Sequence, residues 1–256
     1  CIRDRPEGEE LALLEKYRDQ LPAEIFTRQW KPASTLPPNS LRNNLVKARD
    51  LLAEAGWTIQ DGVLKNQQGE VFELNFLLVQ SGFDRIIAPY AHNLQKLGIE
   101  TRYRKVDTSL YKSRLDNFDF DMVVTSFGTS MSPGNELMNM FESASAQMTG
   151  SDNLPGIESP VVDELVQAVI QSKNRAEVVT ASRALDRVLL YGEYLVPNWY
   201  INVHRIAYWD MFGIPKTQPL YYDPTTWLLK AWWIKNSDKL TVNSTIVKHE
   251  AMNDSK

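Results

Sequence analysis

Residues 72–124 read FELNFLLVQSGFDRIIAPYAHNLQKLGIETRYRKVDTSLYKSRLDNFDFDMVV, and the order of periodicities in this stretch decides the fold. Apolar and polar residues alternate over residues 72–78, which predicts a half-buried strand. Residues 84–97 then repeat apolar side chains at helical spacing, and Gly98 can close that helix.

The second half of the stretch repeats the pattern. Ile99, Thr101 and Tyr103 alternate with charged residues, which predicts a strand with one solvated face. A helix over residues 108–115 and an apolar strand core over residues 122–124 follow. Helices and strands that alternate in this way predict an α/β layer.

Two amphipathic helices are predicted before this layer. The first covers residues 8–21, and the prolines of residues 31–40 then form a linker. The second helix turns Leu45, Ala48, Leu52 and Ala55 inward and stops at Gly56, and the pair Asp61-Gly62 predicts a hairpin turn.

A long loop and two further helices are predicted after the layer. Residues 128–156 are rich in Ser, Gly, Asn and Pro, and loops of this length are commonly functional. Ser159-Pro160 opens one helix, and Asn174 with Glu177 forms the capping box of another. Pro197 is expected to start a last strand.

Composition limits the function classes. The chain has 28 Lys and Arg against 32 Asp and Glu, a net charge of -4, and no long block of one sign. Nucleic acid is therefore not an expected partner. The aromatic residues, 7 Trp and 10 Tyr, suit ligand pockets and ordinary cores equally well.

The one cysteine, Cys1, excludes an internal disulfide, and the sequence has no Cys/His cluster for zinc. Cys1 allows two interpretations, the lipid-bearing residue of a lipoprotein or a truncation point. The sequence has no apolar run of the ~20 residues that a membrane helix needs and no signal-peptide pattern. We expect no cofactor and no metal.

Five short motifs occur in an order that resembles a known family. They are Arg49-Asp50-Leu51-Leu52-Ala53-Glu54-Ala55-Gly56-Trp57, Leu94-Gln95-Lys96-Leu97-Gly98-Ile99, Asp119-Phe120-Asp121, Ser159-Pro160-Val161-Val162-Asp163, and Leu185-Asp186 followed by Val196-Pro197-Asn198-Trp199-Tyr200. Together they resemble the peptide-type extracytoplasmic solute-binding proteins of ABC importers, family 5. Residues 130–136 resemble the subgroup that takes up oligopeptides and microcin C-like compounds. The resemblance covers roughly Glu9 to Trp233.

The resemblance implies an α/β fold that is the second lobe of a two-lobed periplasmic-binding-protein fold, class II and peptide-binding type. Residues 1–202 would form this lobe with an entry helix and linker, residues 203–235 a return to the first lobe, and residues 236–256 a flexible tail. Most of the first lobe is then missing. The implied partners are a short peptide or peptide-like ligand and the membrane permease subunits of an ABC importer. The implied location is periplasmic or extracytoplasmic.

The ligand-binding candidates lie in two places. They are Ser126, Phe127, Gly128, Thr129, Ser130, Ser132, Asn135 and Glu136 in the long loop, and Trp199 and Tyr200 near the implied lobe crossover. Hydroxyls, amides and exposed backbone N–H groups can satisfy the polar backbone of a peptide. The alternatives are a loop that only connects and a tryptophan that only fills a core.

The loop departs from the family pattern at two positions. Many family members carry Gly-Trp and then an Asp that pairs with the ligand's ammonium, whereas this chain has Ser126-Phe127 and Ser130. Glu136 has two interpretations: it takes over the ammonium contact, or it is only solvated. Asp119 and Asp121 are interpreted as structural, because no third metal ligand or general base accompanies them.

Three other functions remain as alternatives. A sugar receptor would use flat Trp and Tyr platforms, and a scaffold protein would need no small ligand. A carboxylate-dependent hydrolase has less support, because the sequence lacks nucleophile-elbow, P-loop and HExxH motifs. We therefore expect a binding protein and not an enzyme.

Overall fold

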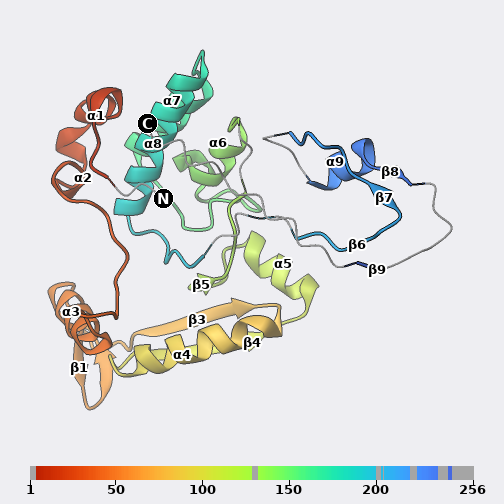
Figure 1. Ribbon diagram of the computed structural model, residues 1–256. Coiled ribbons are helices and arrows are strands. Elements are labelled where there is room, and N and C mark those ends of the chain that lie inside the picture. The colour runs from red at the N-terminus through yellow and green to blue at the C-terminus, as the bar shows by residue number, and fades with distance from the viewer. Residues whose placement is uncertain are drawn as a thin grey trace. The chain divides into compact units, whose positions relative to one another are not determined.

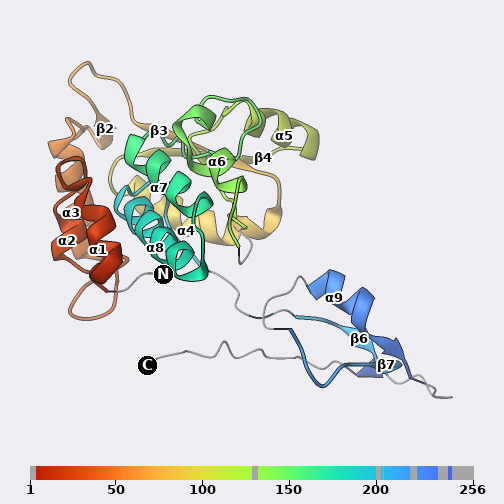
Figure 2. The same ribbon diagram turned by 90° about the horizontal axis from the view of Figure 1, so that it is seen from above.

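The computed structural model describes residues 4–128, 132–199, 203, 205–219, 224–235 and 242–243. The chain divides into two compact units, Cys1–Val196 and Pro197–Lys256. Figures 1 and 2 show the elements of both units from two directions. The predicted domain boundaries at residues 202 and 235 stay a prediction.

A three-stranded parallel sheet organises the middle of the first unit (Figure 1). Strand β3 (Glu73–Leu78) lies between β4 (Glu100–Lys105) and β5 (Met122–Val123). Phe76 pairs with Tyr103 on one side and with Met122 on the other. Parallel strands joined through helices confirm the predicted α/β layer.

The burial of the strands differs from the expected alternation. Leu77 is buried together with Phe76 and Leu78, so the end of β3 is covered on both faces and not half-buried as predicted. This follows from the central place of β3 in the sheet. Strand β4 is predicted to expose only one face. It is an edge strand, however, and almost all of its residues are exposed.

Neighbouring residues set the ends of the helices in the layer. Helix α4 (Asp84–Gln95) buries Ile87, Ala91 and Leu94 against the sheet, and Gly98 follows it with φ +77°. A Cβ at Gly98 would lie 2.7 Å from the Leu64 nitrogen, so the position needs glycine for space as well as for conformation. Asp107 caps α5 (Thr108–Asp116).

The elements of residues 41–65 agree with prediction except at Ala55, which is predicted to face inward and is exposed at the end of the helix. Helix α3 (Leu41–Glu54) packs Leu45, Ala48 and Leu52 against the core of the sheet, and Gly56 has φ +88°. Strands β1 (Thr58–Gln60) and β2 (Val63–Lys65) form an antiparallel hairpin. Its turn residues Asp61 and Gly62 both have positive φ, as a two-residue hairpin turn requires.

A second core is formed mainly by helices, and Ile157, which lies in no helix, is buried in it. It joins α1 (Gly8–Glu15), α2 (Glu24–Thr27), α6 (Glu136–Phe141), α7 (Pro160–Ile170) and α8 (Arg175–Tyr191). Ser159 caps α7, and the Asn174 side chain caps α8 by accepting from the Glu177 nitrogen, as the predicted capping box requires. The Glu177 carboxylate accepts from the backbone nitrogen of Lys173 and not from that of Asn174. Short 3₁₀ turns accompany these helices at Arg18–Gln20 and Ser143–Ser145.

The first predicted helix is shorter than expected. It ends at Glu15 and not at Leu21. Beyond it the chain turns so that the Tyr17 hydroxyl donates to Glu164 of α7 at 2.7 Å. Burial and this hydrogen bond raise the pKa of Tyr17 to about 12. The tertiary contact therefore replaces the last helical turn.

Four charged residues tie the start of the described chain to α8. Arg187 is 1% exposed, and its Nε donates to Glu10 at 2.7 Å. Arg183 donates to the same carboxylate at 3.0 Å, and both arginines reach Asp4. Burial disfavours the charged form of Asp4, but the hydrogen bonds from Arg187 and Arg183 outweigh it and hold the Asp4 pKa below its ordinary value.

The second unit contains short strands and one helix. Strand β6 (Tyr208–Trp209) pairs with β9 (Val242–Asn243), and β7 (Phe212–Gly213) pairs with β8 (Trp233–Ile234). Helix α9 (Pro224–Ala231) comes between β7 and β8 in the chain.

Aromatic side chains fill this unit, since Trp232 packs edge-on against Tyr208 with ring centroids 4.8 Å apart. Residues 197–199 form no strand, so the strand predicted from Pro197 does not begin there, and its continuation through residues 200–202 lies outside the described residues. The predicted tail, residues 236–256, is described only at residues 242–243. Among the described helices of the chain, none combines the length and apolarity that a membrane crossing requires.

Candidate ligand-binding site

The order of the strands indicates at which end of the sheet a ligand would bind. The strand order is β4-β3-β5, so the chain leaves β3 first toward one neighbour and later returns to the other side. In open α/β sheets, ligands bind beyond the carboxyl ends of the strands where the direction of winding reverses. This point lies between β3 and β5, and the loop that follows β5 contains the predicted residues 126–136.

The segment after β5 connects the two cores of the first unit. Val124 packs against the core of the sheet, and Phe127 packs against the core of the helices. The Phe127 ring lies 5.7 Å from the ring of Phe141, tilted by 38°. Phe127 therefore anchors the start of the loop by packing, which is a structural role whether or not a ligand also touches the ring.

The far end of the loop is anchored on the same core. The long loop predicted for residues 128–156 is wrong in its second part, because α6 begins at Glu136. Leu137 and Phe141, four residues apart, both bury into the core of the helices, and this contact stabilises the helix. The Leu137 nitrogen donates to the Gly134 oxygen at 3.0 Å, so a tight turn precedes α6.

Between these anchors the loop presents polar groups. Ser126, Gly128, Ser132 and Asn135 are exposed. Asn135 occupies the N-cap position of α6, but its side chain makes no capping hydrogen bond. The amide of Asn135 is thus available to a ligand.

Glu136 is half-buried, and its carboxylate forms no ion pair with any residue in the described part of the chain. A carboxylate in that state is a suitable acceptor for a cationic ligand group. Thr129 and Ser130, which belong to the same prediction, lie outside the described residues.

The two aromatic candidates belong to the second unit. Trp199 is 60% exposed, so within the described residues it is not the core tryptophan of the alternative interpretation. An exposed indole ring can stack on an apolar or flat ligand group. Tyr200 lies outside the described residues.

A second loop, which the sequence alone does not indicate as part of a site, lies at the same end of the sheet. Strand β3 ends at Leu78, and Gln80 and the turn Ser81–Phe83 follow. Because Leu77 pairs with Val123, the loops after β3 and β5 leave the sheet from adjacent strands. In the sequence, the change from the apolar run to Gln-Ser-Gly marks this loop. Only the strand order identifies the loop as part of a site.

The acidic pair has structural partners. The Asp121 carboxylate accepts from the backbone and side-chain nitrogens of Asn75 at 2.7 and 2.8 Å, which ties β5 to β3. Asp119 pairs with Arg114 at 3.4 Å. Within the described residues no group of three or more His, Cys, Asp or Glu could hold a metal ion.

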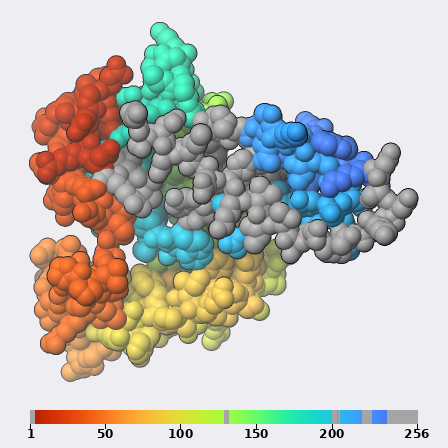
Figure 3. Space-filling model, viewed as in Figure 1, coloured from red at the N-terminus to blue at the C-terminus, as the bar shows by residue number. Residues whose placement is uncertain are grey.

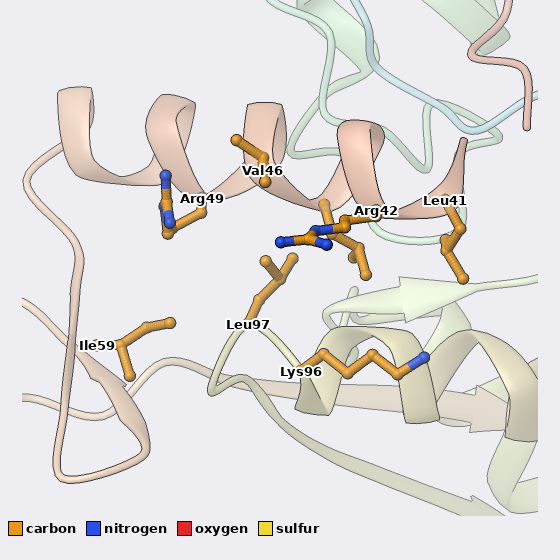
Figure 4. A pocket seen from close by; sticks show the side chains of 8 residues that line it. Leu41, Arg42, Val46, Arg49, Ile59, Lys96 and Leu97 are labelled. Carbon is orange, nitrogen blue, oxygen red and sulfur yellow. The ribbon is translucent and has the colours of Figure 1, made fainter. Parts of the chain in front are cut away.

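Two hollows in the first unit lie away from the loop. One, of about 390 Å³, lies between α3, β1 and the end of α4 (Figure 4), and the other, of about 310 Å³, lies between α4 and β4. None of the residues that line these two hollows belongs to residues 126–136. The predicted loop thus lies outside both of these hollows.

Solved structures define the class of fold. An oligopeptide-binding protein from Bacillus subtilis in complex with a nonapeptide matches 73% of this chain and 38% of its own, with a TM-score of 0.52 and 20% identity. A periplasmic oligopeptide-binding protein from Thermotoga maritima with bound mannohexaose matches 78% of this chain and 35% of its own, with a TM-score of 0.53 and 20% identity. The chain has the fold of part of a two-lobed periplasmic binding protein.

Sequence comparison identifies the family. The family of bacterial extracellular solute-binding proteins described as family 5, middle part, matches residues 13–149, more than half of the chain. The chain belongs to this family.

The curated relatives are named as binding proteins or as uncharacterised proteins. A probable peptide-binding protein YejA from Agrobacterium fabrum is 41% identical over 229 residues, which are 89% of this chain and 37% of that protein. A peptidoglycan-binding protein YepA from the same organism is 30% identical over 224 residues, 88% of this chain and 36% of that protein. The uncharacterised YejA of Escherichia coli is 34% identical over 240 residues, 91% of this chain and 38% of that protein. The chain thus spans little more than a third of the length of these relatives.

Proposed function

We propose that this chain is part of the substrate-binding component of an ABC importer, which reversibly binds short peptides or peptide-like compounds. The observation that carries the proposal is membership of family 5 together with 41% identity to a probable peptide-binding protein. The microcin C-uptake subgroup and the second-lobe division of residues 1–202 are part of the same proposal. The component acts without catalysis of its own.

The loop at the sheet edge suits a peptide. A peptide backbone carries a donor and an acceptor at almost every residue, and each one that is buried needs a partner. Ser126, Ser132 and Asn135 supply such partners, the backbone at Gly128 is exposed, and Glu136 can accept from an ammonium group. Thr129, Ser130, Trp199 and Tyr200 complete the proposed set, with Phe127 as the anchor.

A sugar is the second candidate ligand. One solved structure with this fold holds mannohexaose, and Trp199 offers the exposed ring that a sugar site uses. The relative named as a peptidoglycan-binding protein is relevant to both candidates, since peptidoglycan joins sugars to short peptides. We favour peptides because the loop offers many hydrogen-bonding groups and the 41% identical relative carries the peptide-binding name.

The location and partners follow from the proposed transport role. The component works outside the cytoplasmic membrane, in the periplasm or an equivalent space, and delivers its ligand to the membrane permease subunits of the importer. Reversible binding is required, because the ligand must be released to the permease.

Calorimetric titration tests the ligand class. The longer Agrobacterium fabrum YejA and this chain are each titrated with mixed di- to tetrapeptides and with mannohexaose. We expect saturable binding of the peptides to the relative. Binding of mannohexaose without binding of any peptide would contradict the peptide proposal.

A further inference from the structure

The hollow beside α3 has a composition that the proposed peptide site does not explain. It is lined by three elements of the first unit, with a volume of about 390 Å³. The lining residues are Leu41, Arg42, Leu45, Val46, Arg49, Ile59, Lys96 and Leu97. Figure 4 shows the Arg42 side chain between α3 and the turn that carries Lys96 and Leu97.

The apolar part of the hollow is larger than the core requires. Leu45 of α3 and Leu97 after α4 belong to the packed core of the sheet. Leu41, Val46 and Ile59 add apolar surface outside that core and remain 39%, 41% and 42% exposed. Figure 3 shows part of α3 and its hairpin (orange) at the surface of the first unit. Clustered exposed apolar side chains of this kind mark interaction sites.

The charged part of the hollow has one sign. Arg42, Arg49 and Lys96 line it, and none of the lining residues in this described segment is acidic. Arg49 pairs only with its neighbour Asp50, at 2.8 Å, and Lys96 donates to the Asn93 oxygen at 3.0 Å. Arg42 forms no ion pair with any residue in the described part of the chain. The hollow is therefore cationic although the whole chain carries -4.

We propose that this hollow is the docking site for an acidic, apolar segment of another protein. An apolar centre with arginines at its rim is the composition of protein–protein interfaces. The cations around that centre, of which Arg42 and Lys96 form no ion pair within the described residues, select a partner with carboxylates next to apolar side chains. A small ligand fits less well, since small-ligand sites bury most of the ligand, whereas the walls formed by Leu41, Val46 and Ile59 remain open.

A labelled probe peptide tests the docking site. The probe is an amphipathic helix of about four turns, with Leu along one face and Glu beside it, and the control peptide has Lys in place of each Glu. Fluorescence anisotropy of the probe reports binding to the chain. We expect the acidic probe to bind, the basic peptide to remain free, and added salt to weaken the binding.

Matched variants locate the binding. Arg42→Glu should weaken binding of the acidic probe about tenfold, the factor that corresponds to about 1.4 kcal/mol. Lys47→Glu makes the same charge change on the same helix but outside the hollow, and it should change the affinity by less than about twofold. Val46→Ser should also weaken binding. Because Arg42, Val46 and Lys47 are exposed, these variants are expected to fold, and circular dichroism checks this.

Three outcomes would overturn the proposal. The first is that the acidic probe does not bind the folded chain, and the second is that Lys47→Glu weakens binding as much as Arg42→Glu. The third is that phosphatidylglycerol vesicles bind in an Arg42-dependent way whereas the probe peptide does not, which would assign the hollow to a lipid surface. Each outcome is independent of whether the loop at residues 126–136 binds peptides.

Discussion

At the scale of single residues, Arg187 has the largest predicted effect on stability. Its guanidinium is buried, and Glu10, its partner, is also buried. Removing one partner of a buried ion pair costs about 3–5 kcal/mol, and without Arg187 the buried Glu10 keeps only the more exposed Arg183 as a partner. Arg187→Ala should lower the free energy of unfolding by that amount, as measured by urea denaturation.

Arg183 is the matched control, because it lies on the same helix and pairs with the same Glu10 carboxylate. Its side chain is 44% exposed, and exposed ion pairs contribute about 1 kcal/mol or less. Arg183→Ala should therefore destabilise the chain much less than Arg187→Ala. Equal losses for the two variants would show that burial does not set the strength of this network.

At the scale of elements, the loop between Phe127 and Leu137 gives the prediction closest to function. The Asn135 side chain is exposed and does not cap α6, so the fold does not need its amide. If the loop contacts the ligand, Asn135→Ala should weaken peptide binding by about 1–3 kcal/mol, the cost of leaving a buried ligand group unpaired. The melting temperature should stay nearly unchanged.

Asn139 on α6 supplies the control for this prediction. Its side-chain nitrogen donates to Asp152 at 2.8 Å, so its partner is internal to the fold. Asn139→Ala should leave the affinity for peptides unchanged. Calorimetric titration of both variants in the longer relative, at the aligned positions, is the measurement. Equal affinity of the Asn135 variant and its parent would make the loop a connector only.

Local signals explain which elements the sequence predicts well. The caps at Ser159 and Asn174 and the left-handed positions at Gly56 and Gly98 depend on a few neighbouring residues, and the structure confirms them. The helix that follows Asp107 is also predicted correctly, because its cap, too, depends on a few neighbouring residues.

Long-range contacts explain what the sequence alone does not predict. The burial of Leu77 depends on β3 being the central strand, and the burial of Arg187 depends on Glu10, which lies 177 residues away. Within the site, composition indicates the loop after β5, but the neighbouring loop after β3 becomes part of the site only through the strand order. The ligand-binding roles of Thr129, Ser130 and Tyr200 stay predictions.

At the scale of the whole molecule, the length of the relatives leads to a prediction about the chain by itself. A two-lobed binding protein gains affinity by closing both lobes over the ligand, which desolvates it on all sides. This chain spans 37% of the Agrobacterium fabrum relative. We propose that the chain forms one lobe and a return segment of the other lobe. The chain should therefore bind peptides weakly or not at all when it is tested alone.

The second unit adds a consequence for association. Trp209, Leu229, Trp233 and Ile234 are each more than half exposed, at 54%, 88%, 53% and 64%. Exposed apolar surface of this extent favours self-association. Sedimentation should therefore detect oligomers of the chain at concentrations where the longer relative is monomeric. A monomeric chain with the affinity of the longer relative would show that one lobe holds the complete site.

The short segment from Val124 to Phe127 limits how the site can change in evolution. Its two ends are fixed in different cores, and three residues of extended chain span only about 10 Å. One residue added or removed there would pull Val124 or Phe127 out of its core. Between Gly128 and Asn135, in contrast, both ends are held and the side chains described are mostly exposed, so this part can gain or lose residues at little cost. Insertions and deletions among family members should therefore collect in residues 128–135, where new ligand preferences can arise without disturbing either core.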